Sequence, residues 1–170
     1  MTELAETKSE NVESVRLPNS VLKDEFFALR FTGKISVPKR GKFNFYLNSD
    51  DGSRLFLDGT LVCNNDERHV EQTVVSAIRL EPGLHDLEVQ YFQHDGAKKL
   101  ELLWMGPGVH YSEVATSNLS SLMCRYYVGK WWRLPFDRSC AVSDVVRVMK
   151  SGDAAAVLDK AAGHNSEKFQ

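Results

Sequence analysis

Apolar and polar side chains alternate along most of the chain between Phe26 and Trp104. The apolar positions that share one side are Phe43, Phe45 and Leu47 in a first run, Leu87, Val89 and Tyr91 in a second, and Leu100, Leu102 and Trp104 in a third. Successive side chains of a strand point to opposite faces, so a period of two predicts half-buried β-strands.

Glycine- and proline-containing turns separate these runs. They are residues 38–41 (PKRG), 51–52 (DG), 58–59 (DG), 82–83 (PG) and 95–96 (DG). Such pairs tolerate positive φ or pre-set a turn, and residues 58–59 are suited to a tight hairpin. No helix-length segment lies between the runs, which argues against a parallel α/β fold. The pattern predicts an all-β fold, an antiparallel β-sandwich of jelly-roll type or a barrel.

The two ends of the chain differ from this middle part. Residues 1–12 are polar and lack periodicity, which predicts a disordered tail. Residues 137–170 are predicted to form a short α-helical C-terminal extension, with Ser143 as an N-cap and Gly163 as a stop. The sandwich itself is therefore expected within residues 13–136.

Composition excludes several classes of protein. A length of 170 residues is enough for one domain. The net charge of −2, without a basic block, argues against a nucleic-acid partner. No apolar run reaches the ~18 residues that would predict a membrane span. The first residues lack the pattern of a signal peptide, so we expect an intracellular chain or a fragment of a larger secreted protein.

The three cysteines, Cys63, Cys124 and Cys140, form no CxxC pair. They are interpreted as free, partly buried thiols, or as one disulfide plus a free thiol in an oxidising compartment. The histidines show no metal-ligand spacing and no nucleophile motif is present, so we expect no enzymatic activity.

An ordered series of motifs gives the most specific information in the sequence. Residues 31–62 contain a strand, a Pro-to-Gly turn, a strand ending in SDDG and a short strand ending in DG. Residues 78–108 add a Gly-x-His turn, a Tyr-Phe strand and a strand closed by Gly-Pro-Gly. In this order the motifs closely resemble the protective-antigen-type (PA-14) domain family, over about half of the chain. The resemblance implies a β-sandwich binding module.

The adjacent carboxylates of Asp50 and Asp51 end one of these strands. They repel each other unless hydrogen-bond donors or a cation lie nearby, and calcium prefers such oxygen ligands. In lectin members of the family the pair is joined by a cis peptide and holds a calcium ion that bridges sugar hydroxyls. The resemblance therefore implies Asp50 and Asp51 as metal ligands. Non-lectin members keep the pair to organise the loop, and this second interpretation stays open.

The loop of residues 93–99 differs from the lectin pattern. Lectins of the family supply an Asn here, whereas this chain has His94, Asp95 and Lys98. Asp95 offers a substitute oxygen ligand, and the lysines add positive charge. The predicted ligand site comprises Asp50, Asp51, His94, Asp95 and Lys98.

Two functions follow from these observations. The first is recognition of carbohydrate, with calcium at the aspartate pair. The second is a scaffold module that binds protein partners in an intracellular assembly, through the aromatic segment of residues 126–136 and the C-terminal extension.

The aromatic residues 123–130 resemble the strand with which family members usually begin. The module is therefore interpreted as circularly permuted, with this strand filling the missing place in the sandwich, since termini of a domain often lie close together. The start of a second module and a strand exchanged with a partner are the alternatives.

Overall fold

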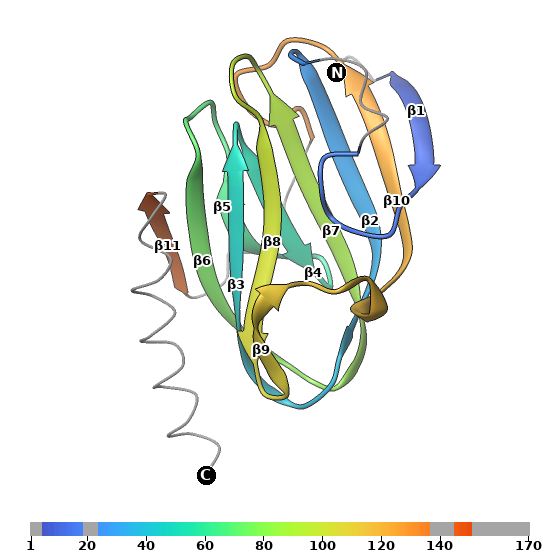
Figure 1. The fold of residues 1–170 in the computed structure, drawn as a ribbon, viewed down its shortest axis with the longest axis vertical. Coiled ribbons are helices and arrows are strands. Elements are labelled where there is room, and N and C mark those ends of the chain that lie inside the picture. The colour runs from blue at the N-terminus through green and yellow to red at the C-terminus, as the bar shows by residue number, and fades with distance from the viewer. Residues whose placement is uncertain (1–4, 19–23, 137–144, 151–170) are drawn as a thin grey trace.

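The computed structural model describes residues 5–18, 24–136 and 145–150, and these form two antiparallel β-sheets packed face to face (Figure 1). The strands are β1 (Glu6–Asn11), β2 (Phe27–Val37), β3 (Gly41–Asp50), β4 (Ser53–Leu57), β5 (Thr60–Asn65), β6 (Gln72–Leu80), β7 (Gly83–Gln93), β8 (Lys99–Gly106), β9 (Val109–Glu113), β10 (Leu119–Val128) and β11 (Val145–Lys150). One sheet has the order β1-β10-β2-β7-β4-β5 and the other β11-β6-β3-β8-β9. The predicted all-β antiparallel architecture is confirmed.

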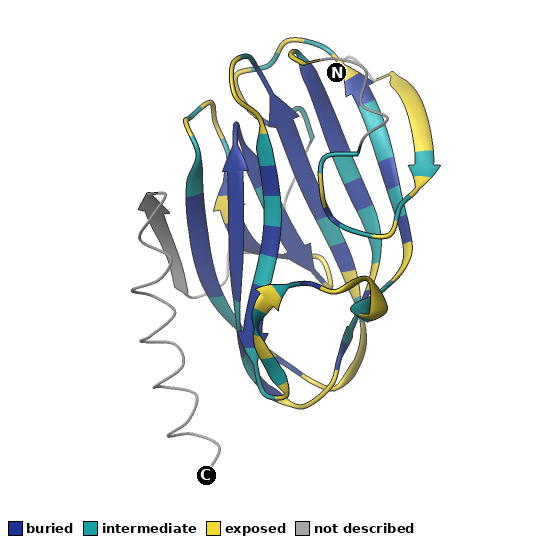
Figure 2. Ribbon diagram, in the orientation of Figure 1, coloured by how far each residue is buried: buried dark blue, intermediate teal, exposed yellow. Residues whose placement is uncertain are grey.

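The core lies between the two sheets and is made of the apolar positions that alternate in the sequence. Phe45, Leu47 and Val89 are fully buried, and Trp104 is buried as predicted. Figure 2 shows the corresponding alternation of buried and more exposed positions along several strands. Cys63 and Cys124 are free, buried thiols, in agreement with the first interpretation, and Cys140 lies outside the described residues.

The expectation of a disordered tail over residues 1–12 is wrong for residues 6–11, which form β1. This strand pairs with β10 from Glu6 opposite Tyr127 to Asn11 opposite Met123. Its side chains are mostly exposed, because β1 lies at the edge of its sheet. Periodicity could not reveal it, since an edge strand that buries little needs no apolar face.

The C-terminal extension is not supported as a helix. Residues 145–150, predicted as helical, form β11 and pair antiparallel with β6. The segment contains three valines, whose branched side chains favour strands, and β6 offers it a free edge. The remainder of the predicted extension lies outside the described residues. No helix in the described part of the chain has the length and apolar character needed to cross a membrane.

The strand-like segment near residue 123 belongs to this same sandwich. β10 lies between β1 and β2, and it pairs with β2 from Leu119 opposite Ile35 to Val128 opposite Phe27. After β10, residues 129–136 fold back on the outer face of the sheet. There Leu134 packs with Phe92 and Tyr127 in a second, smaller apolar cluster.

Candidate ligand-binding groove at the Asp50–Asp51 loop

The Asp50–Asp51 pair lies where the chain crosses from one sheet to the other. Asp50 ends β3 in the five-stranded sheet, and β4 begins at Ser53 in the six-stranded sheet. The peptide bond between the two aspartates is cis, as in the lectins that the sequence resembles. At Gly52 a β-carbon would lie 2.4 Å from the Phe92 ring and 2.9 Å from the Glu67 carbonyl oxygen, so only glycine fits this crossing without a shift.

The Asp51 carboxylate links its own loop to the β5–β6 loop and the β7–β8 loop. It is 2% exposed. One oxygen accepts a hydrogen bond from the backbone N–H of His94 at 2.8 Å, and the other accepts one from the backbone N–H of His69 at 3.3 Å. A buried carboxylate that receives two backbone N–H bonds stabilises the loops that donate them. This geometry supports the loop-organising interpretation for Asp51.

Asp50 has a different environment. Burial raises the pKa of its carboxyl to about 6, and the charge of Asp51 adds to this shift. The backbone N–H of Glu71 hydrogen-bonds to the carboxylate and acts in the opposite direction. The Tyr91 hydroxyl donates to the Asp50 carbonyl oxygen at 2.6 Å, which fixes the backbone from inside the core. The Asp50 carboxylate can therefore still accept hydrogen bonds from groups around it.

A groove of about 610 Å³ opens beside this pair. It is lined by Asp50, Asp51, Arg68, His69, Val70, Asp95, Gly96 and Ala97. The two walls are the β5–β6 loop and the β7–β8 loop, at the upper end of the sandwich in Figure 1. An ion pair joins the walls, with the Arg68 guanidinium 2.7 Å from an Asp95 carboxylate oxygen.

The structure brings together three of the five predicted ligand residues, Asp50, Asp51 and Asp95. His94 is 3% exposed and holds Asp51 through its backbone, so its ring does not line the groove. Lys98 also lies outside the lining and forms an ion pair with Asp24 at 2.8 Å.

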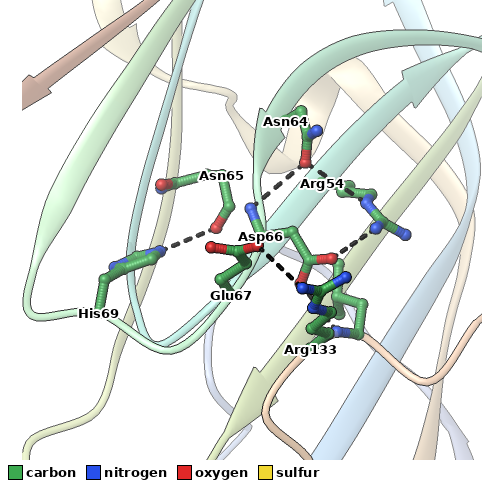
Figure 3. A network of polar contacts seen from close by, with 8 residues as sticks. Arg54, Asn64, Asn65, Asp66, Glu67, His69 and Arg133 are labelled. Carbon is green, nitrogen blue, oxygen red and sulfur yellow. Dashed lines mark hydrogen bonds and ion pairs between the residues drawn. The ribbon is translucent and has the colours of Figure 1, made fainter.

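The β5–β6 loop contributes to the groove although no sequence motif pointed to it. Figure 3 shows the polar network that shapes this loop, in which Asp66 binds Arg54 and the His69 ring contacts the Asn65 carbonyl oxygen. The second Asp66 oxygen accepts a hydrogen bond from the Leu134 backbone N–H at 2.8 Å. Arg68 and His69 carry no recognisable motif, because only the pairing of distant strands places their loop beside Asp50.

A calcium ion at the pair would need oxygen ligands beyond the carboxylates of Asp50 and Asp51. Calcium takes about six to eight oxygen ligands, but within the described ranges no three His, Cys, Asp or Glu side chains converge as metal ligands. Asp95, the expected third acidic ligand, is engaged by Arg68. The Arg68 guanidinium lines the same groove and would repel a cation there.

The sequence matches a known domain family and resembles several known proteins. The family model described as PA14 domain matches residues 5–118. Anti-sigma-I factor RsgI3 of Acetivibrio thermocellus is 27% identical over 103 residues, which cover 60% of this chain and 16% of that protein.

Two solved structures have a similar fold. An anti-sigma factor domain-containing protein has a TM-score of 0.60 and 24% identity, over 64% of this chain and 40% of the other. An anti-sigma factor domain-containing protein from Clostridium clariflavum has a TM-score of 0.58 and 29% identity, over the same shares of 64% and 40%. This chain spans less than half the length of each of these three relatives.

Proposed function

Because the chain belongs to the PA14 domain family, we propose that it is a non-catalytic module that binds carbohydrate in the groove beside Asp50 and Asp51. The observation that carries this proposal is the composition of the groove. A buried carboxyl, Asp50, lies next to the paired charges of Arg68 and Asp95. Sugar hydroxyls both donate and accept hydrogen bonds, and this set offers acceptors and a donor within one concave site.

The Arg68–Asp95 pair is suited to contact ligand because it is accessible. The two side chains are 45% and 42% exposed, and each comes from a different wall of the groove. A guanidinium presents five N–H donors, so binding Asp95 leaves others for a hydroxyl. The groove therefore offers its ligand both a hydrogen-bond donor and a hydrogen-bond acceptor.

Affinity electrophoresis tests this proposal, with mixed-linkage β-glucan, xylan, galactomannan and pectin as soluble probes. We expect at least one polysaccharide to retard the chain, and Asp95→Ala to weaken this binding about tenfold, since a hydrogen bond to a charged group is lost. Asp86→Ala is the matched control, because it removes the same exposed charge from the six-stranded sheet outside the groove. Absence of retardation by every probe would overturn the proposal.

Calcium at Asp50 and Asp51 stays a prediction of the family resemblance. Thermal melting with and without calcium tests it, because an ion that binds the folded state raises the melting temperature with its free concentration. The position of Arg68 leads us to expect no calcium-dependent shift. A shift that Asp51→Asn abolishes would instead establish the aspartate pair as a metal site.

A second candidate function is a scaffold module for protein partners. The observation that favours it is the similarity to proteins named as anti-sigma factors, at 27–29% identity for two of them. The aromatic segment considered for this role contacts its own sandwich, since Leu134, Trp131 and Phe136 belong to the cluster on Phe92. Retardation by a polysaccharide, lost in Asp95→Ala, would favour the carbohydrate module over the scaffold.

A further inference from the structure

Two exposed apolar side chains lie around the groove. The large apolar side chains that stand exposed among the described residues are Val70, Leu84, Val128 and Trp132. Val70 lines the groove and is 80% exposed. Trp132 is 58% exposed and contacts two residues of the groove loops. Single exposed apolar residues are common on proteins, so a role for Trp132 has to rest on its contacts with the groove loops.

The backbone holds Trp132 in this place. Its carbonyl oxygen accepts a hydrogen bond from the Arg68 N–H at 3.1 Å. The neighbouring Trp131 carbonyl oxygen contacts Nδ1 of His94 at 2.9 Å. The Trp131 side chain packs against the apolar cluster on the sheet, while the Trp132 side chain remains largely exposed. Trp132 is thus fixed to both walls of the groove, and little conformational freedom is lost when a ligand contacts it.

The Trp132 ring contacts Arg68, which also lines the polar groove. The Arg68 Cζ atom lies 5.3 Å from the centre of the ring, and the same guanidinium binds Asp95. The buried ring of His94 supports the indole at a centroid distance of 4.1 Å. With both neighbours in place Trp132 as a whole residue is still more than half exposed.

We propose that Trp132 is an aromatic platform on which one sugar unit of a bound glycan stacks while a neighbouring unit occupies the polar groove. This inference rests on the proposed carbohydrate-binding function and names its ligand class. The expected ligand is a chain of at least two sugar units, one of which presents a flat C–H face. Hydroxyls at the edge of a sugar ring match Arg68 and Asp95, and the C–H groups on its face match an indole.

Binding measurements on substitutions of Trp132 test the platform, with the retarding polysaccharide from the four named above as the probe. Trp132→Ala and Trp132→Leu are expected to weaken binding about tenfold. Trp132→Phe keeps a flat ring and is expected to stay within about threefold of the wild type. Leu84→Ala, at another exposed apolar position, is the matched control. Circular-dichroism melting of each variant checks folding, which an exposed side chain should not change.

The possible outcomes distinguish failure of the Trp132 platform from failure of carbohydrate binding as a whole. Loss of binding in Trp132→Ala and Trp132→Leu, with retention in Trp132→Phe, supports the platform. Wild-type affinity in Trp132→Ala or Trp132→Leu, together with loss in Asp95→Ala, overturns the platform alone. If the wild type binds none of the four polysaccharides, the carbohydrate function fails and the platform fails with it.

Discussion

Asp50 and Asp51 are neighbours in sequence with different chemical roles. Both oxygens of Asp51 accept backbone N–H bonds, one from His94 and one from His69. Asp50 is buried beside that charge, and burial raises its pKa from the ordinary value of 3.8 to about 6. The two carboxyls therefore have different roles. Asp51 binds the backbone of both groove walls, and Asp50 lines the groove.

The raised pKa of Asp50 predicts a pH-dependent stability. Between about pH 4 and pH 6 the folded chain holds a proton that the unfolded chain releases, so the contribution of Asp50 to stability falls as pH rises through this window. Asn has no charge to desolvate. We therefore expect Asp50→Asn to gain about 2–3 kcal/mol relative to the wild type between pH 4 and pH 7. Urea unfolding of both proteins at each pH measures this difference.

Asp86→Asn provides the comparison for this experiment, because Asp86 is exposed and paired with Lys34. It should show no such relative gain over the same pH range. A stability difference between Asp50→Asn and the wild type that is constant from pH 4 to pH 7 would contradict the assigned environment of Asp50.

At the scale of elements, residues 129–136 connect the sheet to the groove. Leu134 packs on Phe92 and Tyr127, and its backbone N–H binds Asp66 in one groove wall. The same segment contacts the other wall through His94. The geometry of the groove therefore depends on a segment that follows the last strand of its sheet in sequence.

Leu134→Ala is predicted to make the two walls of the groove more mobile. Removing a buried leucine side chain costs about 2–4 kcal/mol, and we expect the local loss to free both walls. Hydrogen exchange should become faster at the backbone amides of residues 66–70 and 93–97. Leu122→Ala, in the main core, is the control of similar size. If exchange in the two walls rises no more in Leu134→Ala than in Leu122→Ala, the segment does not hold the groove.

At the scale of the whole molecule, β10 completes the six-stranded sheet. The family match ends at residue 118, before β10 begins, yet β10 lies between β1 and β2 in the six-stranded sheet. Without β10, β1 would lose its partner and β2 would become an open edge that invites pairing with other chains. The matched residues alone do not complete the sheet.

A chain that ends at Asn118 is therefore predicted to aggregate or to lack a cooperative melting transition. A chain that ends at Phe136 also lacks β11 but keeps β10 and the segment after it, so it should aggregate less and melt with a cooperative transition. Size-exclusion chromatography and circular-dichroism melting of the two chains compare them directly. Cooperative melting of a monomeric chain that ends at Asn118 would show that β10 is dispensable.

The sequence alone determined the family, the sandwich and the turns, because strand alternation and turn chemistry are local properties that a single chain displays. It also identified Asp50, Asp51 and Asp95, which lie in or next to recognisable turns. The alternation could not reveal β1, which buries little, or the strand over residues 145–150, which was predicted as a helix because Ser143 offers an N-cap before it.

Only the tertiary structure decided which side chains share the groove. Arg68 lies 27 residues before Asp95 in the sequence, and their ion pair exists because β6 and β8 both pair with β3. The placement of Trp132 beside Arg68 depends likewise on β10 entering the sheet next to β2. A contact between distant segments depends on which strands pair. In this chain, burial of the whole core determines which strands pair, and no local sequence pattern shows that pairing.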